Sequence, residues 1–182
     1  MAVYECDGHR PEIGEGTYVH DSATVMGNTR LGRNCFIGPG ARIRGDYGRI
    51  EIGDESSVED NVVIHARPGE ITRVGGHVTL GHGCILHNCT VEDYAVIGMG
   101  AIISDWAVIH EWGVVAEGAV VKNNFEVPER RVAVGVPAKL LDFTLTQEYM
   151  DEWLHFKRIY VRLASEVYPR THKRLDLSNP PL

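Results

Sequence analysis

Aliphatic residues recur at every sixth position along much of this chain. The first run is Ile13, Val19, Val25, Leu31, Ile37 and Ile43. A helix would place apolar residues at intervals of three and four, so the interval of six excludes a helix for this part of the chain. It fits a short strand followed by a corner, with three such units forming one triangular coil. Stacked coils would bury the aliphatic positions in one continuous core.

The repeat changes phase and then recovers. A second run is offset by three residues, which the turn-rich stretch Gly45-Asp46-Tyr47-Gly48 should absorb. A third run resumes after four extra residues, assigned to a loop at 66–73. The later core positions are Ile52, Val58 and Ile64, then Val74, Leu80 and Leu86, then Val91, one residue early, and finally Ile97, Ile103, Ile109, Val115 and Val121. Residues 1–140 are therefore predicted to form one repeat domain.

Hexapeptide repeats of this kind resemble those of left-handed parallel β-helices, so we expect an all-β fold of this type. The left hand comes from the resemblance alone, because parallel crossovers are otherwise right-handed. A β-sandwich with evenly spaced strands is the alternative. Its strands alternate with period two and rarely hold a six-residue phase over so many residues, so the pattern favours the β-helix.

An amphipathic helix is predicted after the repeat, starting near Thr146. Its aromatic stripe recurs at three-and-four spacing and should pack against the side of the β-helix: Tyr149, Trp153, Phe156, Tyr160, Leu163 and Val167. We assign residues 141–168 to this C-terminal helix. Residues 169–182, beginning at Pro169, are assigned to an extended or disordered tail.

Length and composition restrict the function classes. The 182 residues fit a single domain, and the net charge of −7 argues against nucleic acid as a partner. Cys35, Cys84 and Cys89 show no metal or disulfide spacing and are expected to be small buried hydrophobes. No secretory signal or membrane-spanning run is visible, so we expect a cytoplasmic protein with no membrane partner.

Three of the nine histidines fall where the repeat fixes the face that they occupy. His65 and His87 each follow a core position, as Arg44 does, and these positions are three repeat steps apart once the insertions are removed. The three residues should therefore form a column on one face, with coils roughly 4.8 Å apart. Two histidines one coil apart can share a zinc ion.

His82 belongs to the preceding face of the prism. Asp60 occupies the same position one coil earlier, and Glu59 is its neighbour. A rigid prism cannot easily fold two faces around one ion, so a second copy of the chain should bring its His82 to the column. Three such contacts close a cyclic homotrimer with three equivalent sites. The other histidines show no such stacking and are expected to be solvated or structural: His9, His20, His77, His110, His155 and His172.

Several segments closely resemble the γ-class carbonic anhydrase family. They are Arg44-Gly45-Asp46, the run from Ser57 to His65, and the runs 78–82 and 85–90 that contain His82 and His87. The resemblance covers residues ~1–165. It is closest to the branch that contains the phenylacetate-pathway and carnitine-pathway hexapeptide proteins, through residues 44–50 and the opening Val3-Tyr4 followed by Asp7-Gly8.

The resemblance implies a homotrimer that binds Zn²⁺, or Fe²⁺ or Co²⁺, between subunits. His65 and His87 would come from one subunit and His82 from the next. The implied reaction is the reversible hydration of carbon dioxide by a metal-bound hydroxide. Arg44 and Asp46 would lie near the site and bridge the subunits, either with a catalytic role or as a plain ion pair.

Some positions depart from the pattern of that family. Glu59 stands where the family usually has a glutamine that orients the hydroxide, and Ser57 stands where it has an asparagine. Glu59 or Asp60 would orient ligands or water. The acidic proton-shuttle loop is absent or shortened, with Glu70 as a weak substitute.

Other functions remain open at this stage. The same site could hydrolyse an acyl-CoA thioester, although no residues indicate a coenzyme A pocket. A hexapeptide acyltransferase would use a histidine as a base without metal. The presence of three histidines at positions suited to zinc binding argues against this function. A non-catalytic metal-binding scaffold would hold the ion without turnover. The native metal and the small-molecule substrate are not fixed by the sequence.

Overall fold

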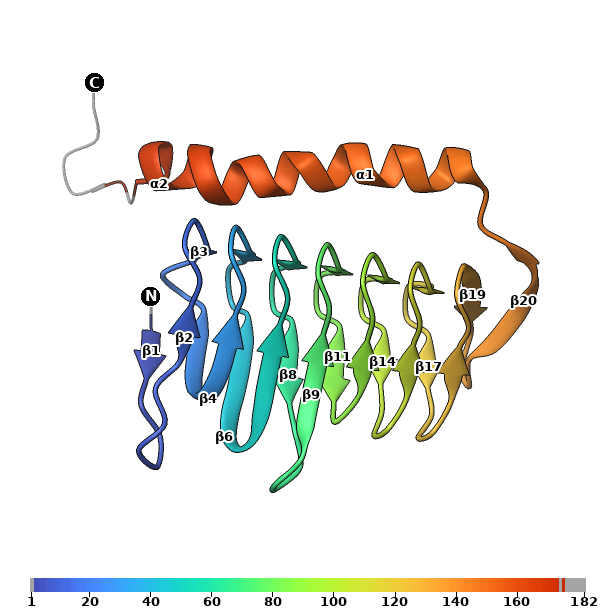
Figure 1. The fold of residues 1–182 in the computed structure, drawn as a ribbon, viewed down its shortest axis with the longest axis horizontal. Helices are drawn as coiled ribbons and strands as arrows, with labels where there is room; N and C mark the ends of the chain where they lie inside the picture. The colour runs from blue at the N-terminus through green and yellow to red at the C-terminus, as the bar shows by residue number, and fades with distance from the viewer. Residues whose placement is uncertain (1, 174, 176–182) are drawn as a thin grey trace.

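The computed structural model describes residues 2–173 and residue 175 of the chain. It confirms the left-handed parallel β-helix with a C-terminal helix alongside (Figure 1). The coils stack along the long axis of the molecule, and the helix lies parallel to that axis over one side. Among the described residues, no helix has the length and apolar character needed to span a membrane.

The prism has three faces. The histidine face holds β1 (Ala2–Tyr4), the first parts of β4 (Thr24–Leu31) and β6 (Arg42–Ile52), β8 (Val63–His65), β11 (Ile85–His87), β14 (Ile102–Ile103) and β17 (Val120–Val121). The groove face holds β2 (Glu12–Ile13), the second parts of β4 and β6, β9 (Ile71–Val74), β12 (Thr90–Val91), β15 (Val108–Ile109) and β18 (Glu126–Val127). The helix face holds β3 (Tyr18–Val19), β5 (Phe36–Ile37), β7 (Ser57–Val58), β10 (Thr79–Leu80), β13 (Val96–Ile97), β16 (Val114–Val115), β19 (Arg131–Val134) and the antiparallel β20 (Lys139–Thr144).

The six-residue repeat forms the core as predicted. Ile43, Ile64 and Leu86 are register partners on successive coils, and each is fully buried. Glycines follow many core positions because successive coils approach closely there. A Cβ atom on Gly53 would lie 2.5 Å from the carbonyl carbon of Gly75, so no larger residue fits without a shift of the backbone.

The three-residue offset is absorbed where the sequence predicts, at Gly45-Asp46-Tyr47-Gly48: Gly27 of β4 pairs with Gly45 and Thr29 pairs with Ile50, so β6 has three more residues than β4 at this corner. The stretch lies within the continuous strand β6 rather than in a separate turn. The first part of β6 pairs with β8 and its second part pairs with β9, so this strand carries the chain from the histidine face to the groove face. The extra residues at this corner are taken up in extended backbone. The loop predicted at 66–73 is shorter, since β9 already begins at Ile71.

The helix begins where the sequence predicts. The Thr146 hydroxyl accepts a hydrogen bond from the backbone of Tyr149 and caps α1 (Gln147–Arg162). A π-helical segment η1 (Leu163–Val167) and α2 (Tyr168–Thr171) follow. The chain is thus helical past Pro169, where a tail was predicted. Residues 174 and 176–182 of that tail lie outside the described residues.

The buried line of the helix differs from its aromatic stripe. The side chains that are buried under it are Met150, Lys157 and Ala164, which are seven residues apart. The Phe156 side chain of the predicted stripe is 46% exposed. Tyr160 does reach the β-helix, with its ring 5.6 Å from that of Phe36. The aromatic residues therefore flank the contact line, and a lysine occupies its centre.

Candidate metal centre

The column on the histidine face is confirmed. Arg44 pairs with His65, and His65 pairs with His87, across β6, β8 and β11. The two imidazole rings lie 5.3 Å apart between their centroids. Adjacent parallel strands thus bring two potential nitrogen ligands together without any help from loops.

Asp46 contacts the first of these histidines. Its Oδ1 lies 2.8 Å from Nε2 of His65, and its Oδ2 lies 3.2 Å from Nε of Arg44. Partial burial would raise the pKa of Asp46, but His65 and Arg44 outweigh it and hold that pKa below its usual value. Asp46 is therefore a carboxylate that fixes the His65 ring. A metal that binds Nε2 of His65 has to displace this contact.

Asp105 orients the second histidine. Its Oδ1 accepts from Nδ1 of His87 at 2.5 Å, and its Oδ2 accepts from Nε of Arg67 at 2.8 Å. Burial would raise the pKa of Asp105, but Arg67 and His87 together lower it. A carboxylate on Nδ1 fixes the ring and its tautomer, which leaves Nε2 available as a metal ligand.

The sequence patterns did not point to Asp105 or Arg67. Asp105 begins the turn after β14, one coil beyond His87, and Arg67 lies in the loop after β8. The guanidinium of Arg67 also lies 5.0 Å from the centre of the Trp106 ring. The sequence held one signal for Asp105, its position. Ser104 extends the histidine column by one coil beyond His87, and Asp105 is the next residue.

His82 lies apart from this column. It occupies the turn after β10, at the edge of the helix face, and its side chain is half exposed. Its Nδ1 is 3.8 Å from Oδ2 of Asp60, and potential ligand atoms of Glu59, Asp60 and His82 lie within 4.8 Å of one another. The predicted residues therefore form two groups within one chain, and the three histidines do not converge there.

A buried lysine lies close to the second group. Nζ of Lys157 donates to Oγ of Ser57 at 2.9 Å and to the carbonyl oxygen of Val78 at 2.7 Å. Burial lowers the pKa of Lys157 to about 7, against the opposing effect of Glu59. Burial also raises the pKa of Glu59 to about 7, against the attraction of Lys157. An amphipathic pattern gave no reason to expect a lysine on the contact line of α1.

The raised pKa of Glu59 predicts a change of stability with pH. The folded state holds this proton up to about pH 7, whereas the unfolded state releases it near the ordinary value of 4.5. The contribution of Glu59 to the free energy of unfolding is therefore fully present below its pKa in the unfolded state. That contribution is lost as the pH rises through the pKa of Glu59 in the folded state. We expect Glu59→Gln to gain stability relative to the wild type between pH 5 and 7.5, by no more than about 3 kcal/mol. Urea unfolding at both pH values measures this. An equal difference at the two pH values would contradict it.

Exposed aliphatic side chains form a ladder beside the histidine column. Val63, Ile85 and Ile102 are register partners on β8, β11 and β14 and are 37%, 40% and 37% exposed. Their side chains point outward from the strands that carry His65 and His87. The histidine face thus presents an apolar stripe to its surroundings.

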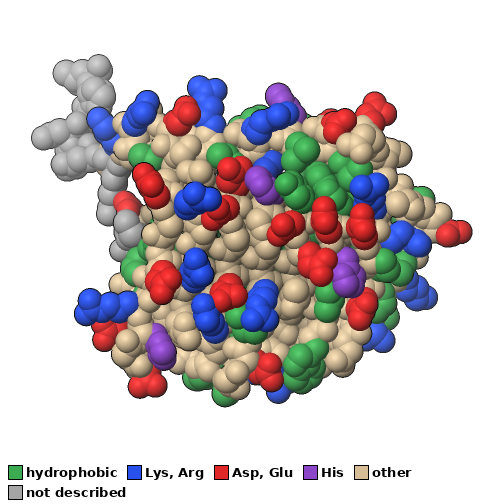
Figure 2. All heavy atoms as spheres, viewed as in Figure 1, with side chains coloured by type: hydrophobic (Ala, Val, Ile, Leu, Met, Phe, Trp, Pro, Cys, Tyr) green, Lys and Arg blue, Asp and Glu red, His purple; other side chains and the backbone are tan. Residues whose placement is uncertain are grey.

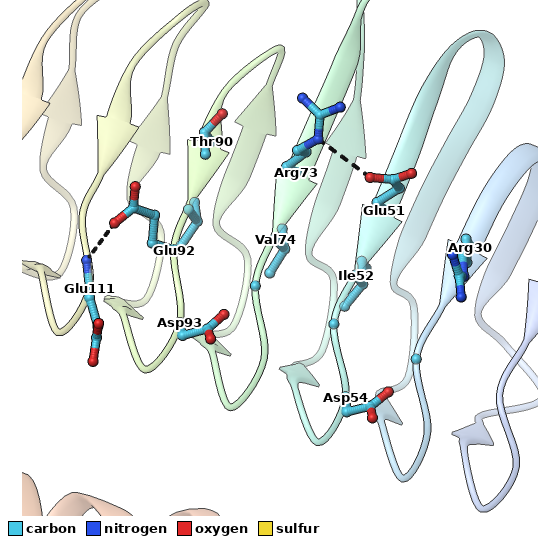
Figure 3. A pocket seen from close by; sticks show the side chains of 14 residues that line it. Arg30, Glu51, Ile52, Asp54, Arg73, Val74, Thr90, Glu92, Asp93 and Glu111 are labelled. Carbon is cyan, nitrogen blue, oxygen red and sulfur yellow. Dashed lines mark hydrogen bonds and ion pairs between the residues drawn. The ribbon is translucent and has the colours of Figure 1, made fainter.

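The groove face contains a polar groove of about 560 Å³ (Figure 3). In this groove Nε of Arg73 lies 3.4 Å from Oε2 of Glu51. Oε2 of Glu92 accepts a hydrogen bond from the backbone N–H of Glu111 at 3.0 Å. None of the predicted site residues line this groove. On the described part of the face seen in Figure 2, acidic and basic side chains are interspersed, and no broad basic patch is present.

Comparisons with known proteins identify the family. A family model for the bacterial transferase hexapeptide repeat matches residues 10–45. Among solved structures, a hexapeptide transferase family protein from Anaplasma phagocytophilum is 31% identical, with a TM-score of 0.85 over 90% of this chain and 96% of that one. A putative acetyltransferase from Bacillus cereus is 30% identical, with a TM-score of 0.88 over 94% and 98%. Carnitine operon protein CaiE of Escherichia coli O157:H7 is 33% identical over 99% of this chain and 89% of its own length. The chain therefore belongs to the family of hexapeptide-repeat proteins that includes carnitine operon protein CaiE.

Proposed function

We propose that this protein is a homotrimeric, metal-dependent enzyme of the γ-class carbonic anhydrase type, which hydrates carbon dioxide reversibly. The observation that carries the proposal is the oriented pair of imidazoles: His87, held by Asp105, stands one coil from His65. Acceptor carboxylates on the second ring nitrogen are typical of histidines that bind metals.

The exposed ladder supports a trimer. Val63, Ile85 and Ile102 offer an apolar surface beside the two histidines, and its burial against a second copy would stabilise the assembly. His82 lies on a different face and is half exposed, so it is accessible to a neighbouring copy. The proposed site combines His65 and His87 of one subunit with His82 of the next.

The donor set fits a divalent metal. Three neutral imidazoles suit Zn²⁺, and Fe²⁺ or Co²⁺ also accept them. The ion would supply Lewis-acid chemistry that lowers the pKa of water to about 7. In this chain Asp105 would orient His87 through Nδ1, whereas Asp46 and Arg44 both contact Nε2 of His65 and would have to release it for an ion bound to that nitrogen. Glu59 and Asp60 place carboxyl oxygens beside His82, where they would accept a hydrogen bond from water.

Carbon dioxide hydration tests this proposal. We expect zinc-loaded protein to catalyse it, and His87→Ala to lose at least about 100-fold in kcat/KM. Stopped-flow measurement with a pH indicator gives the rates, and His155→Ala, an exchange on the outer side of α1, serves as the matched control. An active His87→Ala variant would contradict the proposal. A parallel assay of acyl-CoA hydrolysis distinguishes a thioesterase at the same site.

An acyltransferase is the second candidate. It is favoured by the putative acetyltransferase from Bacillus cereus, which shares the fold at 30% identity. Such an enzyme would use a histidine as a general base and would need no metal. Transfer from acetyl-CoA by metal-stripped protein therefore separates it from the proposal above.

A further inference from the structure

A cavity of about 270 Å³ lies between α1 and the helix face. One wall is apolar and aromatic, with Met99 from the β-helix and Trp153, Phe156 and Tyr160 from the helix. Glu59, Lys157 and Glu117 supply its charged lining residues. A largely apolar cavity with a few convergent polar groups is the usual form of a small-molecule site.

Glu59 brings an unsatisfied acceptor to this cavity. Glu59 is only 4% exposed. The Tyr160 hydroxyl interacts with its carboxyl group, but Oε1 has no hydrogen-bond partner within the described part of the chain. Lys157 does not supply one, because its hydrogen bonds go to Ser57 and to the backbone of Val78. A buried acceptor without a partner costs roughly 1–3 kcal/mol, so a ligand that donates a hydrogen bond there gains affinity.

The surroundings favour a cation as that donor. The carboxyl groups of Glu59 and Glu117 line the cavity with a single lysine, Lys157. Burial raises the pKa of Glu59 and lowers that of Lys157 to about 7 each, so this pair adds no net charge and Glu117 leaves the cavity negative. Aromatic faces attract cations, and three aromatic side chains of α1, those of Trp153, Phe156 and Tyr160, line the same cavity. A primary ammonium offers both the positive charge and the N–H groups.

We propose that this cavity binds a small primary amine, with its ammonium group on Glu59 and its apolar chain against Met99, Trp153 and Phe156. Every residue that forms the cavity comes from one chain. Binding therefore requires neither a second copy nor a metal ion, although the cavity shares Glu59 and His82 with the proposed metal centre.

Titration calorimetry with n-hexylammonium chloride tests the proposal on the intact protein. We expect saturable binding to the wild type and at least about tenfold weaker binding to Glu59→Gln. Glu92→Gln, which removes one carboxylate from the groove face, is the matched control and should bind as the wild type does. n-Hexyltrimethylammonium keeps the charge but has no N–H group, and hexan-1-ol keeps a donor without the charge. Both should bind at least about tenfold more weakly.

Several outcomes would overturn the proposal. Equal binding by Glu59→Gln would exclude Glu59 as the acceptor, provided that circular dichroism shows the variant to be folded. Equal binding of the trimethylated probe would exclude the hydrogen bond, and equal binding of the alcohol would exclude the preference for a cation. Binding that disappears in EDTA-treated protein would assign the amine to a metal ion instead. Binding that survives EDTA supports the cavity.

Discussion

Trimers of His82→Ala and trimers of His87→Ala should each fail to bind zinc. Mixed trimers that contain both variants should recover part of the zinc binding of the wild type. Each proposed site takes His65 and His87 from one subunit and His82 from the next. A His82→Ala subunit still offers the first pair, and a His87→Ala subunit still offers the single histidine. Random mixing should therefore restore about a quarter of the sites.

This result is measured by metal analysis after the two variants are unfolded together, refolded and dialysed against zinc. Each variant refolded alone is the control, and each should stay near zero. Recovery at this level cannot arise if one chain holds the metal by itself. If the mixture binds no more zinc than its components, sites shared between subunits are excluded.

The substitution Ile85→Lys should give a monomer that has lost its metal. Ile85 is the middle residue of the exposed ladder and is 40% exposed, so a lysine fits there in an isolated chain. In an assembly the same lysine would be buried without a partner in an apolar contact, at a cost of several kcal/mol. Sedimentation velocity and metal analysis on the same sample measure both effects.

Val108→Lys is the matched control for this variant. Val108 faces outward from β15 on the groove face, where Glu126 is its register partner. We expect that variant to keep the oligomeric state and the metal of the wild type. If Ile85→Lys remains a trimer, the histidine face is excluded as the subunit interface. If it is a monomer that still binds zinc fully, a metal site shared between subunits is contradicted.

The positions of the core residues and of the histidine column could be predicted because the six-residue repeat determines both. Once Ile64 and Leu86 are assigned to the same step of successive coils, His65 and His87 must be neighbours. The separate face of His82 follows from the same count. The start of α1 was equally local, since Thr146 caps the helix through its own hydroxyl.

Other features depend on contacts that a repeat does not encode. Asp105 matters because its side chain reaches back to His87 and Arg67, which the order of residues does not show. Lys157 is buried because Ser57 and Val78 provide oxygens under the helix, 100 and 79 residues away. Gly45 to Gly48 is rich in turn-forming residues, but it stays within β6 because the residues on both sides of it are paired, Arg44 with β8 and Arg49 with β9.

The C-terminal helix returns the end of the chain to its beginning. α1 starts beside the last coil and runs back along the helix face, so that the Tyr168 ring lies 5.1 Å from that of Tyr18 and His172 meets the Tyr18 hydroxyl (Figure 1). Solenoids in which each repeat touches only its neighbours can unravel from either end, one repeat at a time. Here the first coils cannot fray without releasing the helix, and the helix cannot detach without exposing the flank of the middle coils. The C-terminal helix therefore couples the two ends of the β-helix and makes the unfolding of any coil cooperative with that of the others.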